Sequence, residues 1–271
     1  MNKQIRIAAL PFLALFLATN LPNALAQSTS DEIAKYRQLL ADGNPAELWE
    51  IRGMALWQKK AGPNQTSLEQ CDLGKGKGVV KGAYVELPRY FADTDKVMDL
   101  EQRLLHCRMT LQGLSREQAT KNYFGGPGKA SDMEALVAFI TAESKGFKMA
   151  VALTHPQERR AYEIGKQLFF YRAGSHDFAC TTCHSTDGAR IRLQDLPNIL
   201  NPAQAQGAYT SWPAYRVSQG EVRTMQHRLA DCYRQQRFPV PDYASDTITA
   251  LTLFLAKNAE GGVYAAPALK R

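Results

Sequence analysis

Five consecutive residues, Cys180-Thr181-Thr182-Cys183-His184, have the types and spacing that attach a c-type haem to a polypeptide. In such a motif the two thiols add to the vinyl groups of the haem, and the adjoining imidazole ligates the iron. The sequence therefore predicts one covalently bound haem c, attached through Cys180 and Cys183, with His184 as an axial iron ligand.

The first 26 residues favour this interpretation over a zinc site or a redox dithiol. Lys3 and Arg6 precede an apolar run over residues 7–18, and Ala24-Leu25-Ala26 has the pattern of a signal-peptidase site. The run is shorter than the roughly 20 apolar residues of a membrane-spanning helix. We therefore expect a signal peptide over residues 1–26 and a mature protein in the periplasm, an oxidising compartment.

Composition limits the other possibilities. Of the 271 residues, 45% are hydrophobic, which is ordinary for a globular chain that buries a core. The formal net charge is +7, and the predicted leader contributes two of these positive charges. Such a modest excess is compatible with small anionic substrates or an acidic partner protein. We expect no membrane span in the mature chain and, without a nucleic-acid motif, no nucleic-acid partner.

The second half of the chain repeats the first, at a distance suited to two homologous domains. The matched segments are Gly53-x-x-Leu56-Trp57 with Gly165-x-x-Leu168-Phe169, Gly82-Ala83-Tyr84 with Gly207-Ala208-Tyr209, and Arg103-Leu104-x-x-Cys107 with Arg228-Leu229-x-x-Cys232. In this alignment Cys71 lies opposite Cys183, and Asp72 lies opposite His184. The first repeat therefore has the pattern of a haem site that has lost one thiol and its imidazole.

The repeat also divides the five cysteines. Cys71 and Cys107 occupy the two ends of the degenerate site, so we predict a disulfide between them. Cys232 is then left over. It lies 48 residues after His184, where a cytochrome c domain usually places its second axial ligand.

These features predict an all-α fold of two tandem cytochrome c-like domains, the N-terminal one degenerate and without haem. We expect the domains over residues 27–148 and 149–271. Helices are expected to start at Asn44-Pro45, to cover about residues 155–172, and to start again after Ser245.

A further helix is expected within residues 221–237, because residues at helical spacing form one face: Val222, Met225, Leu229 and Cys232. Arg228 lies one turn before Cys232 on the same side. A cation beside a cysteine favours the thiolate, and a guanidinium presents several donors to a tetrahedral anion.

Three side chains compete for the second axial position: Met225, His227 and Cys232. Methionine is the usual ligand in small electron-transfer cytochromes. However, Leu100 stands opposite Met225 in the repeat, whereas Cys107 stands opposite Cys232. We therefore favour Cys232, whose thiolate would stabilise ferric iron and lower its reduction potential.

Taken together, several blocks resemble the SoxA family, the larger subunits of the SoxAX cytochromes of sulfur-oxidising bacteria. The resemblance covers essentially the whole predicted mature chain and rests on Ser67-Leu68-x-x-Cys71-Asp72-Leu73-Gly74, Leu87-Pro88-Arg89-Tyr90-Phe91, Asp99-Leu100-Glu101-x-Arg103-Leu104-x-x-Cys107, the CxxCH motif, and Arg228-x-x-x-Cys232-x-Arg234-Gln235-x-Arg237. With a single CxxCH, the chain looks like the single-haem type.

The resemblance implies an L-cysteine S-thiosulfotransferase, which joins thiosulfate oxidatively to a cysteine of the carrier protein SoxYZ. It also implies a heterodimer with the cytochrome SoxX and a small c-type cytochrome as electron acceptor. Carried over by motif, Cys232 is the catalytic sulfur, modified to a persulfide, and Arg228 binds the anionic substrate. The alternative is a plain periplasmic electron-transfer cytochrome c with Met225 as axial ligand.

Overall fold

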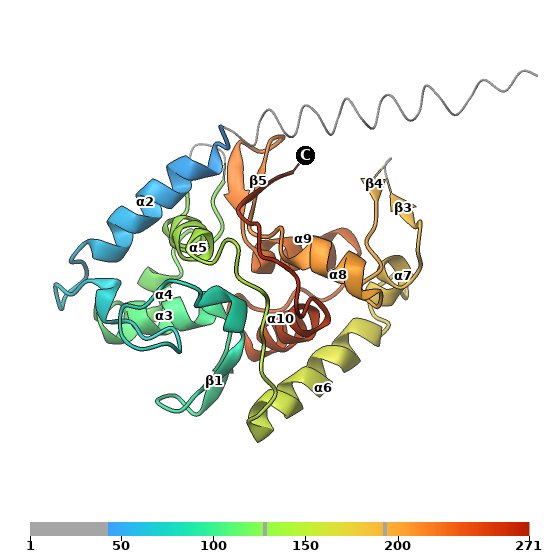
Figure 1. Ribbon diagram of the computed structural model, residues 1–271, viewed down its shortest axis with the longest axis horizontal. Coiled ribbons are helices and arrows are strands. Elements are labelled where there is room, and N and C mark those ends of the chain that lie inside the picture. The colour runs from blue at the N-terminus through green and yellow to red at the C-terminus, as the bar shows by residue number, and fades with distance from the viewer. Residues whose placement is uncertain (1–42, 127–128, 192–193, 271) are drawn as a thin grey trace, which may run out of the picture. The chain divides into compact units, whose positions relative to one another are not determined.

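The computed structural model describes residues 43–126, 129–191 and 194–270, so the expected signal peptide lies outside the described residues. Helices make up most of the regular structure (Figure 1). The helices are α2 (Ala46–Gln58), η1 (Leu68–Gln70), η2 (Tyr84–Glu86), α3 (Leu100–Thr110), α4 (Arg116–Ala119), α5 (Asp132–Ala142), α6 (Pro156–Phe170), α7 (Cys180–His184), α8 (Pro202–Tyr209), α9 (Met225–Gln235) and α10 (Asp246–Asn258). The strands are β1 (Arg89–Phe91), β2 (Lys96–Met98), β3 (Arg190–Ile191), β4 (Gln194–Asp195), β5 (Ala214–Arg216), β6 (Glu221–Arg223) and β7 (Ala268–Lys270).

The fold is mostly helical rather than all-α, because pairs of short strands precede α3, α8 and α9. β1 pairs antiparallel with β2, and β5 pairs antiparallel with β6 and parallel with β7. Strands of two or three residues are too short for an alternating pattern to appear in a sequence. Val222, which we expected on a helix, lies instead in β6. Helix α9 begins after it because the Thr224 hydroxyl accepts a hydrogen bond from the His227 N–H and caps the helix.

The two repeats contain matching elements. The β1–β2 pair followed by α3 corresponds to the β5–β6 pair followed by α9, and α2 and α5 correspond to α6 and α10. The helix starts that we expected are present: the Asn44 side chain accepts from the Ala46 N–H, and the Ser245 hydroxyl accepts from the Ile248 N–H. His155 caps α6 in the same way.

Each repeat is built around one closely packed pair of helices, α2 with α5 and α6 with α10 (Figure 1). A Cβ atom on Gly53 would lie 2.0 Å from the carbonyl oxygen of Ala135, and one on Gly165 would lie 2.0 Å from that of Ala250. Both crossings therefore need a residue without a side chain. This is the structural reason for the glycine in each of the two matched segments.

A continuous buried core joins the two repeats. At its centre the rings of Tyr84 and Tyr209, which are equivalent in the repeat, stack with centroids 6.4 Å apart. Nearby, the Gln226 amide donates to the buried Asp99 carboxylate at 2.6 Å. These contacts place the start of α9 against the first repeat, so the position of its later residues depends on both halves.

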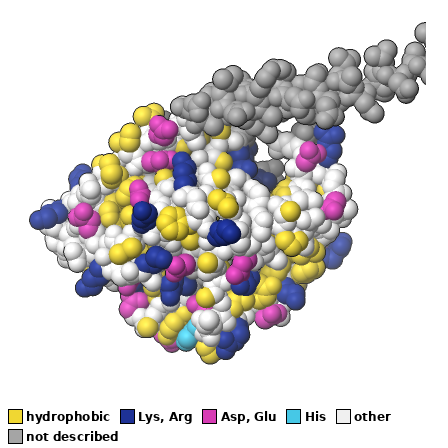
Figure 2. All heavy atoms as spheres, in the orientation of Figure 1, with side chains coloured by type: hydrophobic (Ala, Val, Ile, Leu, Met, Phe, Trp, Pro, Cys, Tyr) yellow, Lys and Arg dark blue, Asp and Glu magenta, His cyan; other side chains and the backbone are white. Residues whose placement is uncertain are grey.

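The surface and the helix lengths add two observations. On the face drawn in Figure 2, basic and acidic side chains are interspersed. Within the three described ranges, no helix has the length and apolar character needed to cross a bilayer.

Candidate haem and sulfur site

The CxxCH motif forms the short helix α7, which follows directly on the loop after α6. That loop is closed by backbone hydrogen bonds between Ala173 and Phe178. The Thr182 hydroxyl accepts from the Ala179 N–H at 3.0 Å and fixes the start of the turn. Cys180 and Cys183 are three residues apart in this helix, so their thiols lie on one side. Both are free and half-buried.

His184 is held by the loop that follows the motif. Its Nδ1 lies 2.9 Å from the carbonyl oxygen of Pro197. A carbonyl only accepts hydrogen bonds, so Nδ1 carries the proton and Nε2 keeps a free lone pair. Burial lowers the pKa of His184, and the charge of Arg228 adds to this effect. The imidazole is therefore neutral and oriented, as a metal ligand requires.

Helix α9 brings a third thiol to the same place. Burial raises the pKa of the Cys180 thiol to about 12, and charges on Cys232 and Cys183 act in the same direction. Burial also raises the pKa of Cys232, while the Arg228 guanidinium opposes the rise. These electrostatic effects require the groups to be close together. The structure thus gathers Cys180, Cys183, Cys232 and Arg228 from two helices that are distant in sequence.

Arg228 is only partly neutralised. Its guanidinium lies 3.7 Å from the Asp231 carboxylate and its side chain is 30% exposed. The same carboxylate accepts from Arg234 at 2.5 Å and from Gln235 at 2.6 Å. Since one carboxylate serves two guanidinium groups, positive charge remains beside Cys232. Arg237 lies at the end of this segment, where its carbonyl oxygen approaches Gly174.

The two other candidate ligands lie elsewhere on α9. Met225 is the first residue of the helix and, with Tyr84, Asp99 and Tyr209, lines a cavity of about 20 Å³ between the repeats. It lies seven positions before Cys232, or about 10 Å along the helix. His227 packs edge-on against Phe124 of the first repeat, with ring centroids 4.7 Å apart. Burial, with the charge of Arg223, lowers the pKa of His227 to about 4.

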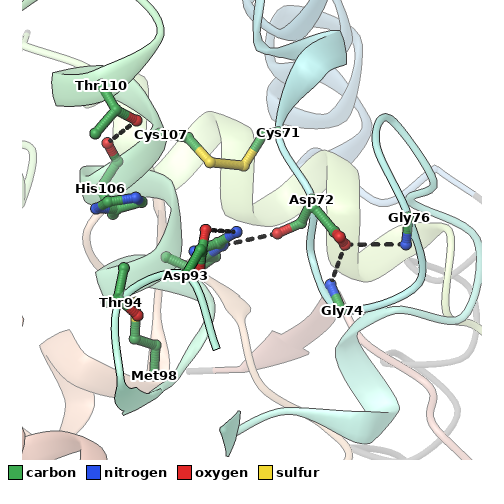
Figure 3. The surroundings of a disulfide bond; sticks show 11 residues. Cys71, Asp72, Gly74, Gly76, Asp93, Thr94, Met98, His106, Cys107 and Thr110 are labelled. Atoms are coloured by element: carbon green, nitrogen blue, oxygen red, sulfur yellow. Dashed lines mark hydrogen bonds and ion pairs between the residues drawn. A yellow bond between two sulfur atoms is a disulfide. The ribbon is translucent and has the colours of Figure 1, made fainter. Parts of the chain in front are cut away.

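The matching place in the first repeat contains a disulfide between Cys71 and Cys107, which confirms the predicted pairing (Figure 3). Asp72, which is aligned with His184 in the repeat, points away from the disulfide (Figure 3). Its carboxylate accepts hydrogen bonds from the N–H groups of Gly74 and Gly76 at 2.7 and 2.9 Å. Leu68, which stands opposite Cys180, is buried beside the disulfide cysteines in the core. The donor atoms of the second repeat are thus replaced by a covalent link and an apolar side chain.

Two features of the site had no sequence signal. The Pro197 carbonyl that orients His184 is a backbone group, and every residue has one. Arg216, at the end of β5, is electrostatically coupled to Arg228 and Asp231 although it lies outside the helix that carries them. Only the pairing of β5 with β6, which leads into α9, could have indicated its position.

Comparison with known proteins shows which family the chain belongs to. The family described as SoxA/TsdA, cytochrome c domain, matches residues 52–149 and again residues 164–263. The L-cysteine S-thiosulfotransferase subunit SoxA of Hydrogenophilus thermoluteolus is 50% identical over 88% of this chain and 87% of its own length. A protein of the same name from Hydrogenobacter thermophilus is 32% identical over 92% of each chain. The solved structure of SoxXA from P. pantotrophus has the same fold, with a TM-score of 0.72 and 24% identity over 88% of this chain and 84% of that chain.

Proposed function

The chain belongs to the SoxA family and is a subunit of an L-cysteine S-thiosulfotransferase, and on this premise we propose that Cys232 is the sulfur through which thiosulfate is coupled to the carrier SoxYZ. The observation that carries the proposal is the meeting of the free Cys232 thiol with Arg228 and with the thiols of the CxxCH helix. In this proposal the chain holds one haem c, in the second repeat.

The residues present fit a haem c. Two free thiols on one side of α7 can bind the vinyl groups, and His184 offers a neutral Nε2 whose orientation is set by Pro197. Cys232 supplies a further soft donor from α9. In the first repeat the equivalent cysteines are joined to each other, and Asp72 is engaged by backbone N–H groups, so that repeat offers no comparable set.

Residues of this chain bind thiosulfate and join it to the carrier. Arg228 binds the sulfonate oxygens of thiosulfate and brings its terminal sulfur to Cys232. A sulfur–sulfur bond forms between them, with release of two electrons and of the thiol proton. The thiolate of the carrier then attacks the outer of the two bonded sulfurs and displaces the Cys232 thiolate, as in ordinary thiol exchange. The net products are the S-thiosulfonate on the carrier, one proton and two electrons.

Haem c, when bound, supplies an electron acceptor beside the Cys232 sulfur. Since one haem accepts one electron, the second electron requires another acceptor. We propose that this acceptor is the SoxX cytochrome, in a heterodimer with this chain, and that a small c-type cytochrome then receives the electrons.

The proposed setting is the periplasm, reached by cleavage of residues 1–26. The proposed domains cover residues 27–148 and 149–271. In the persulfide form that we propose for Cys232, the outer sulfur takes the place of the thiol sulfur in the coupling steps: it bonds to the terminal sulfur of thiosulfate with release of its proton and two electrons, and it leaves as the persulfide anion when the carrier thiolate attacks.

The decisive experiment compares Cys232→Ser with Met225→Leu in the haem-loaded complex with SoxX. Thiosulfate-dependent reduction of a small c-type cytochrome is measured with SoxYZ present, together with the mass of the Cys232 peptide. We expect Cys232→Ser to abolish coupling and to change the haem absorption spectrum, and Met225→Leu to retain both. An extra sulfur atom on the wild-type Cys232 peptide would support the persulfide. Full coupling by Cys232→Ser would refute the role of Cys232, whereas a changed haem spectrum in Met225→Leu with an unchanged one in Cys232→Ser would favour the plain electron-transfer alternative.

A further inference from the structure

Arg216 lies near the site, and no carboxylate of the described residues forms an ion pair with it at contact distance. It lies at the end of β5, half-buried. Its Nε is fully buried and has no hydrogen-bond partner within the described part of the chain. A buried donor of this kind is costly unless another group satisfies it. The side chain therefore has an unused binding capacity that needs an explanation.

The two carboxylates nearest to Arg216 in the strand pair and on α9 form ion pairs with other arginines. Glu221 is its cross-strand neighbour in the β5–β6 pair. The Glu221 carboxylate, however, pairs with Arg223 at 2.8 Å. Asp231, which also interacts electrostatically with Arg216, forms ion pairs with both Arg228 and Arg234. The neighbouring acids thus leave Arg216 unpaired.

The positive charge of Arg228, the proposed substrate-binding arginine, acts on Arg216. Burial lowers the pKa of Arg216, and the next largest effect is the positive charge of Arg228. Two like charges that are partly buried near each other repel, and this repulsion is relieved when an anion lies between them. The arrangement is therefore unfavourable by itself and suited to an anion.

The charges of the cluster match a dianion. Arg216, Arg228 and Arg234 bring three positive charges, and Asp231 brings one negative charge. The remaining charge of about two positive units balances the two negative charges of thiosulfate. The thiosulfonate product on the carrier has one negative charge fewer, so the same cluster holds it less strongly than the substrate. The excess charge thus favours both capture of the substrate and release of the product.

We infer that Arg216 is a second substrate-binding residue, which together with Arg228 holds the sulfonate oxygens of thiosulfate and directs its terminal sulfur toward Cys232. This inference rests on the proposed function. It adds a residue from a strand outside the Arg-x-x-x-Cys helix. It involves binding only, so no bond is made or broken at Arg216.

The test is the kinetics of Arg216→Gln in the haem-loaded complex with SoxX and SoxYZ, with thiosulfate as the variable substrate. Loss of a charged hydrogen-bond partner should raise KM roughly 10-fold or more, with kcat within about twofold of the wild type. Arg216→Lys, which keeps the charge but loses the fork of donors, should give an intermediate KM. The control is Arg160→Gln, which removes an exposed positive charge from α6 and should leave both constants unchanged.

The outcomes separate this inference from the proposed function. If the wild-type complex couples thiosulfate and the KM of Arg216→Gln is unchanged, Arg216 does not bind the substrate, while the role of Cys232 stands. If kcat falls and KM does not change, the residue acts only on the structure of the site. Should Arg216→Gln fail to fold, the KM of Arg216→Lys decides, and a wild-type value overturns the inference. A wild-type complex that does not couple thiosulfate overturns both proposals.

Discussion

The crossing of α6 and α10 at Gly165 gives a sharp prediction for Gly165→Ala. The added Cβ would lie 2.0 Å from the Ala250 carbonyl oxygen and 3.0 Å from the Phe254 Cβ. A tolerable contact of about 3.4 Å would require the two helices to separate by about 1.4 Å, because the nearest group is backbone and has no alternative rotamer. The change must therefore be accommodated by the helix pair that supports the CxxCH helix.

Two opposing effects determine how much Gly165→Ala changes the free energy of unfolding. Replacing glycine by alanine inside a helix stabilises it by up to about 1 kcal/mol. Overpacking in a well-packed core costs about 1–3 kcal/mol, and a contact this short with backbone lies at or beyond the upper end. We expect Gly165→Ala to lower the free energy of unfolding by about 2 kcal/mol or more. Since α6 leads into the haem motif, the variant should also retain less haem during purification.

The assay is urea unfolding followed by circular dichroism, with the haem-to-protein absorbance ratio measured on the same samples. Gly207→Ala is the matched control, because Gly207 lies in α8 with nothing within 4 Å of an added Cβ. It should be as stable as the wild type or slightly more stable. Gly53→Ala should be destabilised to a similar extent as Gly165→Ala, because its clash with Ala135 is the same. If Gly165→Ala were as stable as Gly207→Ala, the close crossing would be refuted.

Three further predictions concern the core and the first repeat. Burial raises the pKa of Glu101 to about 8, so the folded protein keeps a proton there that the unfolded chain releases above its ordinary value of 4.5. The free energy of unfolding should therefore fall as the pH rises from about 5 to 8, by at most about 1.4 kcal/mol per pH unit. In urea unfolding, Glu101→Gln should show a weaker dependence of stability on pH than the wild type. Equal pH dependence in the two proteins would contradict the raised pKa of Glu101. In the same assay, Arg223→Met should lower the free energy of unfolding by about 3–5 kcal/mol, because it leaves the fully buried Glu134 without its partner. The double variant with Glu134→Gln should recover part of this loss. Replacing both Cys71 and Cys107 by alanine should lower the free energy of unfolding by about 4 kcal/mol, because the disulfide joins residues 36 positions apart. The haem spectrum of the second repeat should not change. A changed spectrum would place the disulfide cysteines in the haem site.

Several features followed from the sequence alone because they depend on residues that are close along the chain. The CxxCH spacing, the capping residues before α2 and α10, and the one-turn separation of Arg228 and Cys232 are local properties. The duplication placed Cys71 and Cys107 at equivalent ends of one site, and their predicted disulfide is present. Two cytochrome c domain segments were predicted and are confirmed, in a fold that is mostly helical rather than all-α as expected. The L-cysteine S-thiosulfotransferase activity, which only the resemblance to the SoxA family implied, is also confirmed.

The tertiary structure decided what depends on groups that are far apart in sequence. The strands before α3 and α9 are too short to leave a periodic pattern, so Val222 was wrongly expected on a helix. The proton position on His184 is set by the Pro197 carbonyl, and a backbone acceptor has no signature in the sequence. Whether an arginine is neutralised depends on which carboxylates reach it, and Glu221 pairs with Arg223 rather than with Arg216. The types and local spacing of the reactive groups could therefore be predicted from the sequence, whereas their protonation, neutralisation and mutual approach arise only from the packing of elements that are far apart along the chain.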